Sequence, residues 1–213
     1  MVNNDSHLWF GKKLNLKNEK KRKIVAAAAQ AFSQRGYSGT SVAEIAVQAG
    51  IGKGTIYEYF ASKEDLFFAV FEWYTNITTT GLTVHISALG GSATQRLEAL
   101  NEAIMNLWDE IQDIYALTME FWAASSASLM RQRFQEAFKY LYQNLREMVS
   151  SLIQDGIDLG EFNQDVDAKA VASAMVGTWD ALFLQAWFDP EFQPLATAQH
   201  FLKVVLRGLK SLY

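Results

Sequence analysis

The sequence predicts an all-α protein. Three observations favour this class: half of the 213 residues are hydrophobic, only two are proline, and apolar residues recur at helical spacing over long stretches. A chain of this length and composition can bury a sizeable core. We expect about nine helices, arranged as an N-terminal three-helix head that contains a helix-turn-helix and a larger C-terminal helical body.

The composition argues against several classes of protein. No uncharged apolar stretch reaches about 18 residues, and the N-terminus lacks the apolar core and cleavage site of a secretion signal. The chain has no cysteine, and His7, His85 and His200 are far apart without metal-ligand spacing. We therefore predict a cytoplasmic protein with no membrane segment, and we expect no catalytic residue, metal or cofactor.

The charges are unevenly distributed along the chain. Residues 1–70 hold ten Lys or Arg against six Asp or Glu, a net charge of +4, whereas residues 71–213 hold nine against seventeen, a net of −8. Salt screens charges separated by more than about 8–10 Å, so a basic head can bind phosphates on an otherwise acidic protein. The asymmetry indicates a dedicated binding end; the alternative is a charged face that is merely solvated.

The N-terminal part is expected to begin with a flexible tail over residues 1–18. Lysines in this tail could reach DNA phosphates, but a solubilising tail is the simpler interpretation. The apolar period then predicts a helix from Glu19 to Arg35 that stops at Gly36. Cations at residues 20–23 crowd its first turn, where the helix dipole disfavours them unless an anion such as DNA phosphate compensates.

The stretch Thr40–Lys63 carries the pattern of two short helices joined by a tight turn. Ser41 and Glu44 form an S-x-x-E capping box at the start of the first helix. Gly50 stands where that helix would end in a left-handed conformation. In the second helix Ile56 and Phe60 face the core, and the outward residues are small or hydrogen-bonding. Such a helix can enter the major groove of DNA, which is the helix-turn-helix arrangement.

The remaining helices follow from the same periodicity. Ser62 and Asp65 cap a helix that runs toward Thr80, ends before Gly81, and links the head to the body. Further helices are expected over residues 93–112, 114–124, 129–154, 165–188 and 194–212, with Gly156 and Gly160 in a loop. The predicted division is a tail over residues 1–18, a DNA-binding domain over residues 19–66, and an effector-binding and dimerisation domain over residues 67–213.

Residues 20–70 resemble the DNA-binding head of the TetR (tetracycline repressor) family. The string AAAAQAFSQRGYSGTSVAEIAVQAGIGKGTIYEYFASKEDLF is similar to the family pattern F-x-x-x-G-Y/F, T-S/T-x-x-x-I-A, A-G-I/V-x-x-G-T-I/L-Y-x-Y/H-F and S-K-E-x-L. Four linked segments fall at the family spacing in one unbroken run. The body shows only the general helical character that the family would imply.

The resemblance implies roles for individual residues in the head. Thr40 and Ser41 stand where family members bind phosphate oxygens, as do the two tyrosines of the second helix and Lys63. The start of that second helix stands where family members meet base edges, and a lysine there can donate to guanine O6 and N7. For the tyrosines, core packing with a wet hydroxyl is the alternative. The predicted DNA-contacting residues are Thr40, Ser41, Lys53, Gly54, Thr55, Tyr57, Tyr59 and Lys63.

The body is rich in aromatic and methionine side chains, which are more often core residues than ligand contacts. Six tryptophans in 213 residues nevertheless favour a cavity for an apolar or aromatic effector with one or two polar handles. Glu120 could meet a cation there, although a solvated carboxylate is the simpler interpretation. The candidate effector residues are Met105, Trp108, Tyr115, Met119, Trp122, Phe138, Tyr142 and Met175.

The last two helices are candidates for a homodimer interface, which the resemblance also implies. A two-fold dimer places two recognition helices about 34 Å apart, in successive major grooves of a palindromic site. The alternative is that their apolar residues are simply core. The candidate interface residues are Trp179, Phe183, Trp187, Phe201 and Val205.

Together these observations predict a DNA-binding transcriptional regulator. We expect a repressor that binds a double-stranded operator as a homodimer and is released by a small-molecule effector in the body. The alternatives are a helical DNA-binding regulator without an effector, and a helical bundle that binds only proteins.

Overall fold

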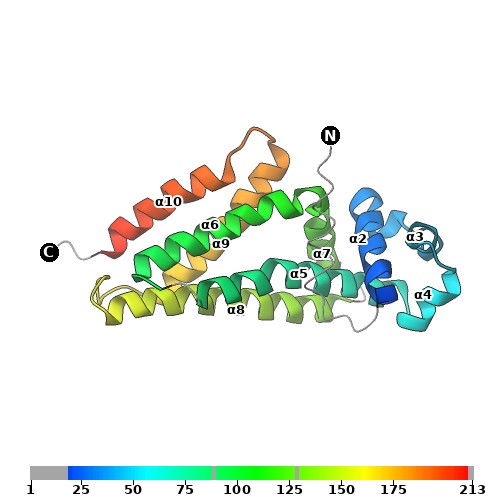
Figure 1. The fold of residues 1–213 in the computed structure, drawn as a ribbon, viewed down its shortest axis with the longest axis horizontal. Helices are drawn as coiled ribbons and strands as arrows, with labels where there is room; N and C mark the ends of the chain where they lie inside the picture. The colour runs from blue at the N-terminus through cyan, green and yellow to red at the C-terminus, as the bar shows by residue number, and fades with distance from the viewer. Residues whose placement is uncertain (1–18, 88–89, 128–129, 211–213) are drawn as a thin grey trace. The chain divides into compact units, whose positions relative to one another are not determined.

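The computed structural model describes residues 19–87, 90–127 and 130–210, and the tail predicted over residues 1–18 lies outside them (Figure 1). Within these residues the chain forms nine α-helices and one short 3-10 helix, without a strand, which confirms the predicted all-α class. The elements are α2 (Glu19–Gly39), α3 (Val42–Ala49), α4 (Lys53–Tyr59), α5 (Lys63–Ser87), α6 (Ala93–Ile111), η1 (Gln112–Ile114), α7 (Ala116–Ala127), α8 (Arg131–Asp158), α9 (Ala168–Phe188) and α10 (Pro194–Leu209).

The chain divides into two compact units. Unit 1 is drawn from Met1–Thr79 and Glu110–Glu136, and unit 2 from Thr80–Asp109 and Ala137–Tyr213. Unit 1 thus holds α2, α3, α4 and α7, together with the first parts of α5 and α8. This division differs from the sequence boundary at residue 66, because α7 returns to the helices of the head. The functional division into a DNA-binding and an effector domain stays a prediction.

The core of unit 1 is aromatic. Phe67 on α5 lies at its centre, with ring centroids 5.1 Å from Phe32 on α2, 5.2 Å from Phe121 on α7 and 5.6 Å from Phe134 on α8. All four rings are 1% exposed or less. Edge-to-face and tilted ring pairs at these separations are favourable beyond the area that they bury. These contacts hold α7 and the head together as one unit.

Glu120 on α7 fixes the end of the first helix. Gly36 has a positive φ of 70°, which ends the helical path where the sequence predicts, although the assigned helix continues past this kink to Gly39. The Glu120 carboxylate accepts a hydrogen bond from the backbone N–H of Tyr37 at 3.1 Å. A Cβ on Gly36 would lie 2.6 Å from Glu120 Oε1. The expectation of a solvated Glu120 is therefore wrong, because this carboxylate is held by a backbone amide.

The core of unit 2 is built by α6, α8, α9 and α10. Aliphatic side chains fill most of it, including Leu97, Leu100, Ile153 and Leu202, each buried. One polar link crosses the core, because Trp179 Nε1 on α9 donates to Oδ1 of the buried Asn101 on α6 at 2.9 Å. A buried indole N–H needs such a partner, so this bond fixes how α6 and α9 pack.

Two predicted helix ends are wrong, because glycine alone does not end a helix. Helix α5 continues through Gly81 to Ser87, and α8 continues through Gly156 to Asp158. Glycine inside a helix costs about 1 kcal/mol relative to alanine, which the rest of a long helix can offset. Position 156 has no room for a side chain, since a Cβ there would lie 2.3 Å from Phe162 Cδ2 and 2.9 Å from Ala93 Cβ. The loop forms at Gly160, where φ is +75°.

Candidate nucleic-acid interface

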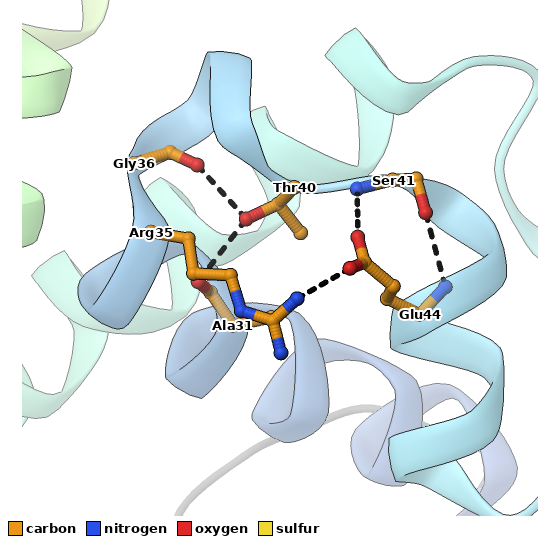
Figure 2. A network of polar contacts seen from close by, with 6 residues as sticks. All are labelled: Ala31, Arg35, Gly36, Thr40, Ser41 and Glu44. Atoms are coloured by element: carbon orange, nitrogen blue, oxygen red, sulfur yellow. Dashed lines mark hydrogen bonds and ion pairs between the residues drawn. The ribbon is translucent and has the colours of Figure 1, made fainter.

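The first helix of the helix-turn-helix, α3, is closed at its start by the predicted capping box. Glu44 N donates to Ser41 Oγ at 3.2 Å, and Ser41 N donates to Glu44 Oε2 at 2.8 Å (Figure 2). Arg35 on α2 pairs with the other carboxylate oxygen of Glu44. The Ser41 backbone amide, and secondarily its hydroxyl, lowers the pKa of the Glu44 carboxyl. The box therefore both caps α3 and attaches it to α2.

The turn between α3 and α4 has the left-handed residue that the sequence indicates. Gly50 has a φ of 67° and a ψ of 33°, and Ile51 N donates to Ala46 O at 3.0 Å. This six-to-one bond satisfies a carbonyl that the helix end would leave unpaired. Ile45, Ala46 and Ile56 are each at most 2% exposed, so α3 and α4 share a buried seam.

The second helix, α4, exposes three of its five predicted DNA-contacting residues and partly buries the other two. Lys53 and Gly54 are exposed, Tyr57 is 48% exposed, and Thr55 and Tyr59 are partly buried. A Cβ built on Gly54 meets no atom within 4 Å. The fold therefore does not require glycine here, and a helical glycine lowers stability.

Thr40 is a correction to the predicted set. Its side chain is 2% exposed, and its hydroxyl is shared between Gly36 O at 2.8 Å and Ala31 O at 3.1 Å (Figure 2). Both acceptors belong to α2, so the hydroxyl ties the end of that helix to the start of α3. It is not available to a phosphate. Ser41, the next residue, is exposed, and its hydroxyl can still donate outward while its oxygen caps α3.

Lys63 lies at the first turn of α5, beside an aromatic ring. Its Nζ is 4.2 Å from the centroid of the Tyr37 ring, and burial lowers the pKa of this lysine. The Tyr37 hydroxyl donates to Glu64 Oε1 at 2.8 Å, and burial raises its pKa, with Glu64 adding to the effect. The partly buried Lys63 is thus positioned by the Tyr37 ring.

The cations at the start of α2 are partly compensated within the chain. Glu19 in the first turn forms an ion pair with Lys23 at 3.0 Å, and this lysine lowers the pKa of Glu19. Lys21 Nζ lies 5.4 Å from the centroid of the Phe60 ring. An exposed pair of this kind contributes little to stability. These contacts partly offset the unfavourable interaction of the cations with the helix dipole, and they do so without an external anion.

The candidate effector residues are divided between the two units. Unit 1 holds Tyr115, which is buried, and the partly buried Met119 and Trp122. In unit 2, Met105 and Met175 lie in the hydrophobic core, and Phe138 stacks on Tyr142 with centroids 6.2 Å apart. Trp108 stacks on Phe183 at 5.7 Å, so a candidate interface residue lies beside a candidate effector residue. Their effector role stays a prediction.

The candidate interface residues differ in exposure. Trp179 is 5% exposed and belongs to the core of unit 2, so it has little surface to offer a partner. Phe183 and Val205 are partly buried against that core, whereas Trp187 and Phe201 are each 37% exposed. Sequence reasoning did not single out two exposed residues of α9, Gly177 and Phe188, as interface candidates. Val204 on α10 is 65% exposed.

Asp180 was also missed, although the sequence held a signal for it. It is the single acidic residue within α9, whose other residues are mostly apolar. In the structure its carboxylate is partly buried and accepts a hydrogen bond from the Tyr142 hydroxyl.

The two short helices, their left-handed turn and their exposed polar face define a helix-turn-helix DNA-binding protein. The model of bacterial regulatory proteins of the tetR family matches residues 24–70, and that of the C-terminal part of BetI-type transcriptional repressors matches residues 93–212. The second match covers more than half of the chain, so the protein belongs to the tetR family of transcriptional regulators. The resemblance predicted from residues 20–70 is confirmed.

Individual relatives span nearly the whole chain. The HTH-type transcriptional repressor KstR2 of Rhodococcus jostii (strain RHA1) is 26% identical over 211 residues, covering 92% of this chain and 93% of the relative. Among solved structures, FadR from Bacillus subtilis in complex with stearoyl-CoA has a TM-score of 0.73 at 23% identity, covering 88% and 98%. A regulator from Saccharomonospora viridis in complex with choline has a TM-score of 0.77 at 19% identity, covering 91% and 98%. At these identities the two structures support the fold.

In the part of the chain that the structure describes, none of the helices is both long and apolar enough to span a membrane.

Proposed function

We propose that this regulator is a ligand-responsive repressor that binds a palindromic operator as a homodimer and releases it when a small effector binds the body. Such a protein would work in the cytoplasm, where the DNA is. The observation that carries the DNA-binding part is the surface of α4. There an exposed Lys53 and a half-exposed Tyr57 surround Gly54, whose Cβ position is empty.

The geometry of α4 supports a role for this surface in recognising the base sequence of DNA. Lys53 can donate to guanine O6 and N7, the commonest contact that distinguishes a base pair. The open space at Gly54 lets the backbone approach the base edges. Ser41, Tyr57 and Lys63 offer hydroxyls and a cation to phosphates, contacts that position a protein on DNA without reading sequence. Thr40 is left out of this set because its hydroxyl is buried.

The exposed faces of α9 and α10 support the homodimer. On α9 small residues are exposed at helical spacing, at Ala170, Ala174, Gly177 and Ala181. On α10, Phe201 is 37% exposed and Val204 65% exposed. Small residues allow two helices to approach closely, and apolar ones lose water when a second copy covers them.

The effector part of the proposal is supported by the relatives and by the side chains of the body. One solved relative is in complex with stearoyl-CoA and another with choline, which supports a small-molecule effector for this chain too. We propose that the effector shifts a conformational equilibrium through α5, which begins in unit 1 and ends in unit 2. The change would alter the separation of the two recognition helices.

The operator is the first thing to establish. We would select double-stranded DNA from a random library with the purified protein and measure binding by fluorescence anisotropy at about 0.15 M salt. The expected result is a palindromic sequence whose half-sites are about one helical turn apart, or a multiple of it. A failure to enrich any sequence would favour a bundle that binds only proteins.

The dimer is tested by sedimentation equilibrium at micromolar concentration. Wild type is expected to be a dimer, and Ala174→Arg and Val204→Arg are expected to be monomers with weakened operator binding. Leu159→Arg is the matched control, because Leu159 is an exposed apolar residue of unit 2 outside α9 and α10. A monomeric wild-type protein would reject the dimer.

Release is tested by adding candidate effectors to the operator complex, among them acyl-CoA thioesters and organic cations. If a wide panel leaves operator affinity unchanged, the chain is a DNA-binding regulator without a small-molecule effector.

A further inference from the structure

Unit 2 contains a carboxylate in an unusual setting. Asp180 on α9 is partly buried, and its Oδ2 accepts a hydrogen bond from the Tyr142 hydroxyl on α8 at 2.7 Å. None of the ion pairs formed by the described residues includes it. Burial raises the pKa of this carboxyl, and the hydrogen bond from Tyr142 opposes that rise with a smaller effect. Among the described residues, this carboxyl therefore has a hydroxyl partner and no ion-pair partner.

Two stacked pairs of aromatic rings are linked to this carboxylate, one through its own helix and one through Tyr142. Phe183 follows Asp180 by three residues on α9, so the two side chains share a helix face. The Phe183 ring stacks on Trp108 of α6, with centroids 5.7 Å apart and planes 19° apart. The ring of Tyr142, whose hydroxyl donates to Asp180, stacks on Phe138 at 6.2 Å. All four aromatic side chains are partly buried and belong to unit 2.

Neither a helix cap nor an ion pair accounts for this carboxyl among the described residues. Asp167, for comparison, caps α9 by accepting from the backbone N–H groups of Lys169 and Ala170, and Asp155 pairs with Arg96. Asp180 lies in the middle of α9, where every backbone N–H is already used by the helix. A carboxylate withdrawn from water without a cation is unfavourable. Groups retained at such a cost are frequently functional.

The chemistry around Asp180 selects one class of ligand. Aromatic ring faces attract a cation within about 6 Å of the ring centroid, and the attraction strengthens when the cation loses water. The carboxylate would supply the opposite charge, and the ring edges would contact apolar substituents. An anionic headgroup placed here would be repelled by Asp180. An uncharged ligand would leave the carboxylate without a counter-ion.

We propose that Asp180 and Tyr142, with the flanking rings of Trp108, Phe183 and Phe138, bind the cationic group of the effector, an organic ammonium ion with apolar substituents. This inference rests on the proposed function only for its regulatory meaning. Binding itself is a property of unit 2 and can be measured without DNA.

The experiment is isothermal titration of the free, full-length protein. The probes are choline and benzyltrimethylammonium, with 3,3-dimethylbutan-1-ol as the uncharged carbon isostere of choline. At least one cation is expected to bind, and the uncharged isostere roughly tenfold more weakly than choline, or not at all. Absence of binding by both cations, or equal binding of choline and its isostere, would overturn the proposal.

Variants locate the binding. Asp180→Asn and Tyr142→Phe are expected to weaken cation binding by about tenfold or more and by a few-fold, respectively. Trp108→Leu removes one ring and is expected to weaken it as well. Asp165→Asn is the matched control, since Asp165 is an exposed carboxylate of unit 2, and its affinity should equal wild type. Unchanged affinity in Asp180→Asn, or an equal loss in Asp165→Asn, would contradict the site.

Stability separates a binding residue from a structural one. Asp180→Asn is expected to melt at or above the wild-type temperature, because it removes an uncompensated charge. If it melts well below wild type, Asp180 is structural and the proposal fails.

Operator affinity of the Asp180→Asn variant without ligand should match wild type. If a cation binds at Asp180 but does not release the operator, the site stands and the effector part of the proposed function fails. If only an uncharged ligand binds and releases the operator, this inference fails and the proposed function stands.

Discussion

Helices α3 and α4 are neighbours of nearly equal length, with eight and seven residues, but their polar groups are used in opposite ways. In α3 the capping box, the Arg35 ion pair and the left-handed Gly50 satisfy both ends within the chain. In α4 the N-cap is Gly52, which has no side chain to offer. Within the described part of the chain, Lys53 and Tyr57 take part in no hydrogen bond or ion pair. The polar groups of α3 thus stabilise the fold, whereas the outward polar groups of α4 are left available to a binding partner.

The strongest way to break this comparison is to remove the outward side chains of α4. The double variant Lys53→Ala, Tyr57→Ala is expected to lose roughly 100-fold in operator affinity, at about 1–2 kcal/mol for each contact. Its melting temperature should match wild type because both side chains are exposed. Anisotropy at fixed salt measures the loss, and Lys169→Ala, Tyr140→Ala in unit 2 is the matched control. Unchanged affinity would favour a bundle that binds only proteins.

A substitution at Gly54 should move stability and affinity in opposite directions. Gly54→Ala is expected to stabilise the protein by about 0.5–1 kcal/mol, because alanine favours a helix and its Cβ meets no atom. Operator affinity should fall by about tenfold, because the methyl group occupies the space through which the backbone approaches DNA. Urea unfolding and anisotropy measure the two effects. If affinity is unchanged, Gly54 is not at the interface.

Ser41 tests whether α3 also contributes to DNA binding. Ser41→Asp keeps an N-cap acceptor and suits the helix dipole, so stability should be close to wild type. Operator affinity should fall by about fivefold, because the new charge repels a phosphate. Ser41→Ala should instead lose about 1 kcal/mol of stability through the missing cap. Equal operator affinity for Ser41→Asp and wild type would exclude Ser41 from the interface.

The smallest expected effect concerns acid. The Glu44 pKa is lowered in the folded protein from an ordinary value of 4.5. Its ionised form therefore stabilises the fold above that value, and this contribution is lost as pH falls through the lower, folded pKa. Glu44→Gln keeps an acceptor for the Ser41 amide but does not titrate. Its urea midpoint should depend less on pH than that of wild type between about pH 5 and pH 3. Parallel curves for the two proteins would assign the acid sensitivity to other carboxyls.

The head could be predicted from the sequence because its structure is specified locally. The capping box joins residues three apart, and Gly50 and Ile56 act within one turn of their neighbours. Leu66, Phe67 and Phe71 are buried as the helical period indicates. The sequence did not predict the burial of Thr40, because its hydroxyl bonds to carbonyl groups four and nine residues earlier.

The body was predicted less well, because its details depend on contacts between residues distant in sequence. Glu120 looks solvated until α7 is placed against the amide of Tyr37, 83 residues away. Gly156 looks like a loop residue until Phe162 and Ala93 are seen to occupy the space beside it. Trp179 looks like an interface residue until its indole is seen to donate to Asn101. No periodicity within one helix encodes these partners.

The position of α7 in unit 1 has a consequence for any hybrid in which the DNA-binding head is replaced. A single genetic crossover near residue 66 would transfer α2, α3 and α4 without Phe67, Phe121 and Glu120. The transplanted head would then lose its aromatic support and the carboxylate that holds the Tyr37 amide. A working hybrid therefore needs two matched segments, or a recipient that already carries an acidic residue opposite the glycine of the first helix. A single crossover would therefore give a stable hybrid only with a recipient that supplies these contacts.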